Sequence, residues 1–291
     1  MTAPPVPRPH ALRPWARLPL NAHPTLRLGL LILLGTLGVA AWGTVALPGA
    51  GQQDLAQSFL PPLSPGHLLG TDQLGQDVLA WTSAGIWVGL EVSLAVVSIS
   101  AVTGISVGLC AGYFGGVVDA LVMRLVDVCL SIPPLLVFVA AAALLRPSML
   151  TLILLISVVA WLPYARLVRS VVLVERERGY LLAARLSGAT RRRVLAGHLL
   201  PAVSTPVLVL SSLQAGYVLL WEAGLSFLGL GIRPPQHSLG YLIAEGRETL
   251  STAWWVVVFP GAALALLVLA AHLIGDGLRD LVQQDVEILG G

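Results

Sequence analysis

Residues 169–194 read RSVVLVERERGYLLAARLSGATRRRV, an arginine-rich segment that interrupts a chain of otherwise apolar stretches. Of the 291 residues, 56% are apolar and only 11% are charged, whereas soluble domains carry roughly 25% charged residues. A lipid bilayer is the solvent that accepts such a surface. The sequence therefore predicts an all-α polytopic membrane protein, in which this segment is a loop on one side of the membrane.

The apolar stretches on either side have the length of membrane-spanning helices, each of which needs about 20 mostly apolar residues. Pro133 and Pro134 interrupt the third stretch, and Gly224, Gly229 and Gly231 crowd the end of the fifth. We therefore expect a kink or a partly re-entrant end in each of these two spans. The six predicted transmembrane helices lie near residues 26–47, 86–111, 117–145, 149–168, 202–231 and 254–274.

The distribution of arginine predicts the orientation, because short cytoplasmic loops are rich in basic residues. The first 27 residues contain four Arg and no acid, whereas residues 48–85 contain three Asp and no Arg. Both termini are therefore expected in the cytoplasm. The predicted organisation is a cytoplasmic arm at 1–25, a first transmembrane helix at 26–47, an external loop at 48–85, a core of five transmembrane helices at 86–280 with a cytoplasmic loop at 169–201, and a cytoplasmic tail at 281–291.

Composition argues against several classes of function. All 17 basic side chains are Arg, so the chain lacks the Lys that a GxxxxGK phosphate-binding loop requires. The net charge of +2 is small and its positive residues are clustered, so nucleic acid is not an expected partner. The sequence offers no catalytic constellation and no metal-ligand motif, which predicts a protein that is not itself an enzyme. Cys110 and Cys129 lie in apolar stretches, where we expect two buried thiols rather than a disulfide.

Within the loop, Gly188 is predicted to separate two short helices. The first would be amphipathic, and a pair of this kind must cover the lipid surface, the protein's own helices or another subunit. The arginines alone are equally consistent with a role in retention and orientation. The predicted apolar face comprises Leu181, Leu182, Ala184, Leu186 and Val194.

The spacing of small residues in this loop resembles a signature of the permease subunits of ABC importers. That signature has two alanines, a glycine after three further residues, and Leu-Pro before the fifth span. In the family the loop docks in a groove of the ATPase subunit, usually with a Glu where this chain has Leu182. The resemblance implies an ATPase-docking loop made of Leu182, Ala183, Ala184, Gly188, Ala189, Arg192, His198, Leu200 and Pro201.

An external segment narrows the resemblance to one branch of these permeases. Residues 67–81 read HLLGTDQLGQDVLAW, which is similar to the element HPLGTDELGRDVLSR of permeases for dipeptides, oligopeptides and nickel, with Gln76 in place of the usual Arg. The segments at 112–136, 222–235 and 259–280 also look like parts of this family. The resemblance covers nearly everything after His67 and is closest to the C-type permease of each pair.

Ionisable residues inside apolar spans are costly to insert and are therefore candidates for function. Arg124 and Asp127 lie three residues apart on one helical face, which favours an internal ion pair. Glu222 and Ser226 lie toward the outer end of the fifth span. In relatives the matching segment lines the translocation path or packs against the partner permease, so these two residues are candidates for the path.

The resemblance implies a type I importer permease that works with a homologous permease subunit, two ATPase subunits and an external solute-binding protein. ATP would be bound by the ATPase partners, and the chain itself would need no cofactor. Two other classes remain open from the residues alone. One is a transporter driven by an ion gradient, which predicts repeats with discontinuous helices in both halves. The other is a membrane scaffold that binds a cytoplasmic partner without transport.

Overall fold

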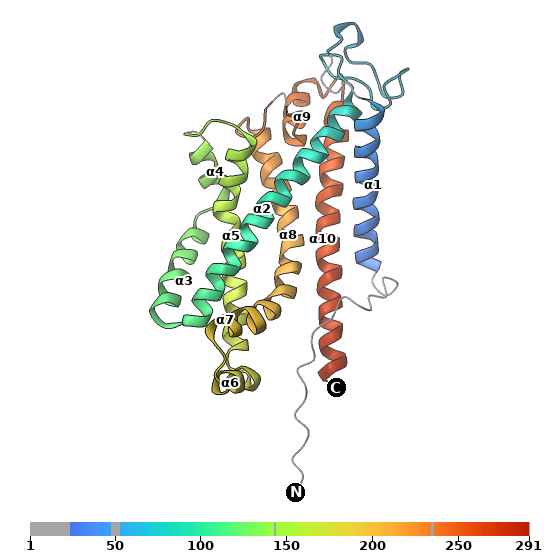
Figure 1. Cartoon of the computed structure of the whole chain (residues 1–291). Helices are drawn as coiled ribbons and strands as arrows, with labels where there is room; N and C mark the ends of the chain where they lie inside the picture. Colours follow the sequence, from blue (N-terminus) through green and yellow to red (C-terminus); the bar gives the residue numbers. More distant parts are fainter. Residues whose placement is uncertain (1–23, 48–52, 143, 234–235, 291) are drawn as a thin grey trace.

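A computed structural model describes residues 24–47, 53–142, 144–233 and 236–290, so the predicted N-terminal arm lies almost wholly outside the described residues. The described chain is a bundle of helices (Figure 1). Its long helices are α1 (Pro24–Ala46), α2 (Val78–Phe114), α5 (Met149–Glu175), α8 (Leu200–Phe227) and α10 (Trp255–Gly290). Its shorter helical elements are η3 (Leu55–Gln57), α3 (Gly116–Ser131), α4 (Pro134–Ala142), α6 (Gly179–Leu186), α7 (Arg191–Val194), η4 (Leu195–Leu199), α9 (Leu239–Gly246) and η5 (Arg247–Thr249).

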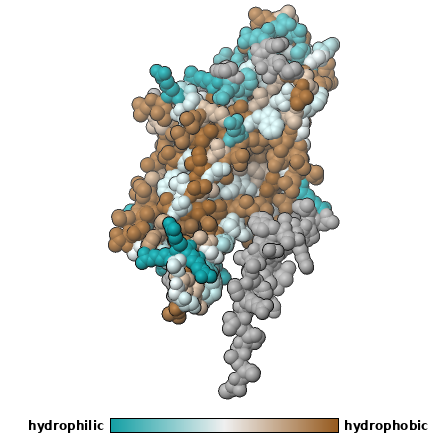
Figure 2. All heavy atoms as spheres, viewed as in Figure 1, coloured by the Kyte–Doolittle hydropathy of each residue, from teal (hydrophilic) through white to brown (hydrophobic). Residues whose placement is uncertain are grey.

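Five helices are long and apolar enough to cross a membrane, and the α3–α4 pair passes the same test as one span bent by 80°. This agrees with the prediction of about six transmembrane helices. The bend falls at Pro133 and Pro134, where a kink was expected, because a proline supplies no N–H to the carbonyl one turn earlier. In Figure 2 apolar residues form a broad belt around the middle of the molecule, and hydrophilic residues gather toward its two ends.

Three predicted boundaries differ from the structure. Helix α2 begins at Val78, inside the segment assigned to the external loop, because the Asp77 carboxylate caps the helix by accepting from the Ala80 N–H. Helix α5 continues to Glu175, past the predicted end of the fourth span. Helix α10 runs on through the segment assigned to the C-terminal tail and ends at Gly290.

Helices α2 and α5 make the most extensive contact between any two described helices, and glycines spaced four apart explain how. A Cβ at Gly104 would stand 2.3 Å from the Tyr164 Cβ, and one at Gly108 would stand 2.6 Å from the Ala165 carbonyl oxygen. Small residues at this spacing let two helix backbones approach, and this is a main source of association inside a membrane. The main apolar core lies around this pair, and includes Val92, Val96, Ile156, Ala160 and Val218.

The two cysteines correct one prediction. Both are free, but Cys110 is exposed on the surface of α2 and Cys129 is only partly covered in α3. The expectation of buried thiols assumed that an apolar stretch packs against protein. In a membrane the lipid-facing side of a helix is equally apolar, so composition alone does not separate the two environments.

Candidate functional site

The segment between α5 and α8, residues 176–199, is called the arginine loop here. Its start is clamped to the end of α5 by one carboxylate. Glu175 pairs with the Arg178 guanidinium at 3.1 Å and accepts a hydrogen bond from the Tyr180 hydroxyl. Burial, together with this bond to the Glu175 carboxylate, raises the pKa of Tyr180 to about 12. Helix α6 therefore leaves α5 in a fixed direction, and Figure 1 shows it projecting beyond the ends of α2 and α8, level with the end of α10.

The break between α6 and α7 lies where the sequence predicts it. Gly188 has φ of +79°, a left-handed conformation that suits glycine. The Ala189 N–H donates to the Ala184 carbonyl at 3.0 Å across this turn, which is the six-to-one bond of a Schellman motif. The next helix begins at once, because the Thr190 hydroxyl accepts from the Arg193 N–H. Small residues at 184, 188 and 189 thus build a tight turn.

The predicted apolar face of the loop is divided between two directions. Leu181, Val194 and Leu199 are fully buried and pack on a cluster from α5 and α8 that includes Tyr164, Val168, Val172, Val203 and Val207. Leu182 and Leu186 instead point outward, with 49% and 90% of their surfaces exposed. The prediction that these residues form a single covered apolar face is therefore wrong. The loop is anchored by one apolar set and presents another.

His198 joins the two halves of the loop. Its ring stacks on Tyr180 with centroids 6.1 Å apart, and its Nδ1 lies 3.3 Å from the Arg193 carbonyl oxygen. It belongs to a five-residue π-helical turn, η4, that leads directly into α8. The predicted residues Leu200 and Pro201 follow directly after this turn, at the start of α8.

A notch of about 380 Å³ opens beside the turn. Its lining brings together the predicted residues Ala184, Gly188, Ala189 and His198. Ser187, Thr190 and Arg193 complete the lining, and prediction from the sequence did not single them out. Ala183 and Arg192 are exposed nearby. Residues of the predicted docking loop and residues outside that set thus line the same small concavity.

The predicted ion pair between Arg124 and Asp127 does not form. The Asp127 carboxylate accepts a hydrogen bond from Arg166 on α5, and Arg124 is exposed without an ion pair to any side chain that the structure describes. A second link between the same helices was missed, in which Arg169 binds both carboxylate oxygens of Asp119 at 2.7 and 2.6 Å. Spacing within one helix does not reveal a partner on the next. The excess of Arg in α5 facing two acids of α3 was the available signal.

Glu222 and Ser226 lie in a buried cluster near the C-terminal end of α8. Glu222 Oε1 accepts hydrogen bonds from the Ser226 hydroxyl at 2.8 Å and from the Ser238 hydroxyl at 2.6 Å. The Ser226 hydroxyl also accepts from the Ile232 N–H at 3.2 Å. Both side chains are only 1% exposed. They hold the segment before α9 against α8, and their expected role in lining the translocation path stays a prediction.

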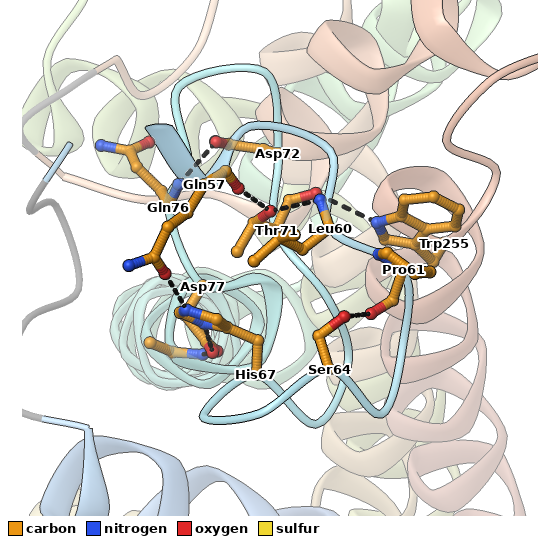
Figure 3. A network of polar contacts seen from close by, with 11 residues as sticks. Gln57, Leu60, Pro61, Ser64, His67, Thr71, Asp72, Gln76, Asp77 and Trp255 are labelled. Carbon is orange, nitrogen blue, oxygen red and sulfur yellow. Dashed lines mark hydrogen bonds and ion pairs between the residues drawn. The ribbon is translucent and has the colours of Figure 1, made fainter. Parts of the chain in front are cut away.

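At the end of the bundle opposite the arginine loop, residues 54–77 form a compact polar structure, called the cap here (Figure 3). The His67 ring lies between the Asp77 carboxylate, at 2.8 Å, and the Gln57 side-chain amide oxygen, at 2.6 Å. The Thr71 hydroxyl donates to the Gln57 carbonyl and accepts from the Leu60 N–H. These hydrogen bonds all join residues of the cap to one another.

The cap is also joined to α10 and α9. The Trp255 indole N–H donates to the Thr71 carbonyl at 3.0 Å, and the Gln73 amide donates to the Glu245 carboxylate on α9 at 3.1 Å. Burial raises the pKa of Asp72 and of Glu245, and the nearby charge of Asp72 adds to the shift of Glu245. Gln76, which replaces an Arg of the resembling permeases, is 3% exposed. Its amide oxygen has no partner among the described residues.

Comparison with known proteins gives consistent results. Residues 104–288 match the family described as binding-protein-dependent transport system inner membrane component. A putative peptide transport system permease protein of Brucella abortus is 37% identical over 275 residues, which cover 93% of this chain and 91% of that protein. A di/tripeptide transport system permease protein of Pseudomonas aeruginosa is 41% identical over 213 residues, covering 73% and 70% of the two chains. An oligopeptide transport system permease protein of Mycobacterium bovis is 38% identical over 225 residues, covering 77% of each.

Proposed function

Because the chain belongs to the family of binding-protein-dependent transport system inner membrane components, we propose that it is the permease subunit of an ATP-driven importer for peptides or a related small solute. Dipeptides, oligopeptides and nickel chelates are the solutes that the resemblance of residues 67–81 covers. The chain forms half of the translocation path in the inner membrane. The observation that carries the proposal is the arginine loop, which is anchored to two transmembrane helices and offers an uncovered apolar surface.

The proposed ATPase-docking surface is the solvent-exposed side of α6 together with the adjacent notch. Leu186 is 90% exposed, and its helix α6 lies beyond the ends of α2 and α8, where lipid does not cover it in the way it covers the span surfaces. An exposed apolar side chain beside a concavity is typical of a site that a partner protein covers. Leu182, in place of the usual Glu, makes the contact with the ATPase apolar rather than ionic. The exposed Arg191, Arg192 and Arg193 form its basic rim.

Coupling follows from the way in which this surface is attached. Leu181, Val194 and Leu199 fix the loop to α5 and α8, and Gly188 and Thr190 fix the angle between its two helices. A movement of the ATPase subunits between two nucleotide states is therefore transmitted to the bundle as a rotation of α5 and α8. The energy comes from the different contacts that the loop makes with the two states. ATP is bound by the partner subunits alone.

The other proposed partners occupy the remaining surfaces. With both termini and the arginine loop in the cytoplasm, the cap faces outward and meets the solute-binding protein. A homologous permease subunit covers the break between α3 and α4. At this break Ile132 is 44% exposed, and the proline-freed backbone requires cover by protein or water at membrane depth. An ion-gradient transporter or a scaffold is not favoured, since the relatives are named as permeases of peptide transport systems.

The docking role is tested by Leu186→Asp in the chain co-expressed with the second permease and the ATPase subunits of its system. A central apolar contact contributes about 2 kcal/mol or more to binding, so we expect copurification of the ATPase to fall at least about tenfold. Peptide uptake should fall with it. The melting temperature of the chain should not change, because the Leu186 side chain touches solvent.

The matched control is Leu55→Asp, which places the same charge on a leucine that is 71% exposed in the cap. This variant should retain the ATPase. Equal retention of the ATPase by both variants would show that the solvent-exposed side of α6 is not the docking surface.

A further inference from the structure

A groove of about 870 Å³ lies between α3, α5, α8 and α10, in the half of the bundle nearest the arginine loop. Its walls are mostly apolar, but Ser170, Arg166 and Arg279 stand at its loop end. The volume is in the range of sites that hold ligands of a few hundred daltons, about 300 to 1,000 Å³. The remaining lining residues are Leu130, Pro163, Leu167, Pro206, Val209, Leu210, Leu213 and Val282.

Prolines inside two helices line this groove. Pro163 lies inside α5 and Pro206 inside α8, and both line it. Neither supplies an N–H to the carbonyl one turn earlier. Leu130, which also lines the groove, stands four residues before Pro134 and loses its helical donor in the same way. Such backbone survives at membrane depth where protein or water satisfies it. The carbonyls freed by Pro163 and Pro206 belong to Val159 and Ala202, which are not among the lining residues, so the prolines contribute apolar surface to the walls.

Two arginines stand at the loop end of the groove. Arg166 is bonded to Asp127, whereas Arg279 forms no ion pair with any side chain that the structure describes, although Asp276 and Asp280 are neighbours on its own helix. None of the described lining residues is acidic. A guanidinium that forms no ion pair with a described side chain, beside an apolar groove, suits a solute that has a carboxylate. A hydrocarbon chain would not use the guanidinium.

We infer that this groove is a solute site on the inward part of the path, in which the Arg279 guanidinium receives the terminal carboxylate of a peptide. The inference rests on the proposed function and adds the site and the chemical group recognised there. Guanidinium binds carboxylate in a two-point geometry that Lys does not reproduce in full. Arg279 is therefore a specificity residue for solutes with a free carboxyl end.

The first test compares uptake of radiolabelled trialanine and of trialanine amide by the complete transporter in proteoliposomes. Arg279→Gln should lower uptake of trialanine about five- to tenfold, because a charge-assisted hydrogen bond is lost, and should change uptake of the amide less than about twofold. Arg279→Lys should restore part of the trialanine uptake. Arg124→Gln, which removes an exposed arginine outside the groove, should leave the ratio of the two peptides unchanged.

A second measurement tests access to the groove independently of transport by the whole complex. In a chain with both native cysteines replaced by alanine, Val209→Cys should react with a membrane-impermeant cationic thiosulfonate in open membranes. Trialanine should slow that reaction. Leu34→Cys, a 63% exposed position on the surface of α1, should stay unreactive.

Equal losses for both peptides in Arg279→Gln, or an unreactive Val209→Cys, would overturn the inference while leaving an active wild-type importer intact. Copurification of anionic phospholipid that is lost in Arg279→Gln, together with equal losses for both peptides, would assign the groove to a lipid headgroup instead. Absence of trialanine uptake by the wild type would count against the proposed function itself.

Discussion

The two polar ends of the molecule are stabilised in opposite ways. In the cap, hydrogen bonds join residues to one another and to Trp255 and Glu245, so that its polar groups are turned inward. In the arginine loop, three buried apolar side chains hold the segment to the bundle, and its remaining apolar surface is turned outward. The hydrogen bonds of the cap are made within this chain, although Leu55 and Leu63 on its surface are 71% and 82% exposed. The loop has an exposed apolar surface, which we assign to contact with the ATPase.

The largest effect should come from removing the link between the cap and α10. Trp255→Ala deletes a 7% exposed indole and its bond to the Thr71 carbonyl, and should destabilise the cap by about 3 to 5 kcal/mol. Amide exchange of cap residues measures this directly. The neighbouring Trp254 is 49% exposed, and Trp254→Ala should cost far less. Equal effects would mean that the cap is not held by Trp255.

A second prediction compares the same substitution in the two regions. Gly75 and Gly188 both have positive φ, but a Cβ at Gly75 would stand 1.8 Å from the Asp54 carbonyl oxygen, whereas a Cβ at Gly188 would meet nothing within 4 Å. Gly75→Ala should destabilise the cap by about 2 to 4 kcal/mol, and Gly188→Ala the loop by only about 1 to 2. Limited proteolysis of each region reports the difference. A larger loss of protease resistance in Gly188→Ala than in Gly75→Ala would contradict this prediction.

The smallest effect concerns pH. The pKa of Glu245 is raised in the folded protein by burial, so the folded cap binds more protons than the unfolded chain as pH rises from 4.5 through the shifted value. Its stability should therefore decline over that interval, in the same direction as the contribution of Asp72. Glu245→Gln should reduce the decline by less than about 1 kcal/mol. Substitution of the exposed Glu248 by Gln should leave the pH profile of cap proteolysis unchanged.

Much of the fold could be predicted because apolar length and proline position act locally. The six spans and the bend at Pro133–Pro134 follow from these features alone. Gly188 was also predictable as a break, since its role depends on its own backbone. The spacing of Gly104, Gly108 and Gly112 was a usable signal for the α2–α5 contact that prediction from the sequence did not exploit.

Tertiary partners could not be predicted in this way. Asp127 pairs with Arg166 on another helix rather than with Arg124, and Glu222 is buried against Ser238, which lies 16 residues further along the chain. Leu181 and Leu182 were placed on one face, although one is buried and the other is 49% exposed. The direction in which a short helix leaves α5 decides between them, and that direction depends on the Glu175 clamp.

The most direct test of the account is the nucleotide dependence of uptake. Proteoliposomes with the chain, its partner permease, the ATPase subunits and the binding protein are loaded with ATP or with a non-hydrolysable analogue, and radiolabelled trialanine is added outside. The account predicts accumulation with ATP, none with the analogue, no change on addition of a protonophore, and loss in Leu186→Asp. Accumulation that needs a proton gradient and persists without ATP hydrolysis would contradict it.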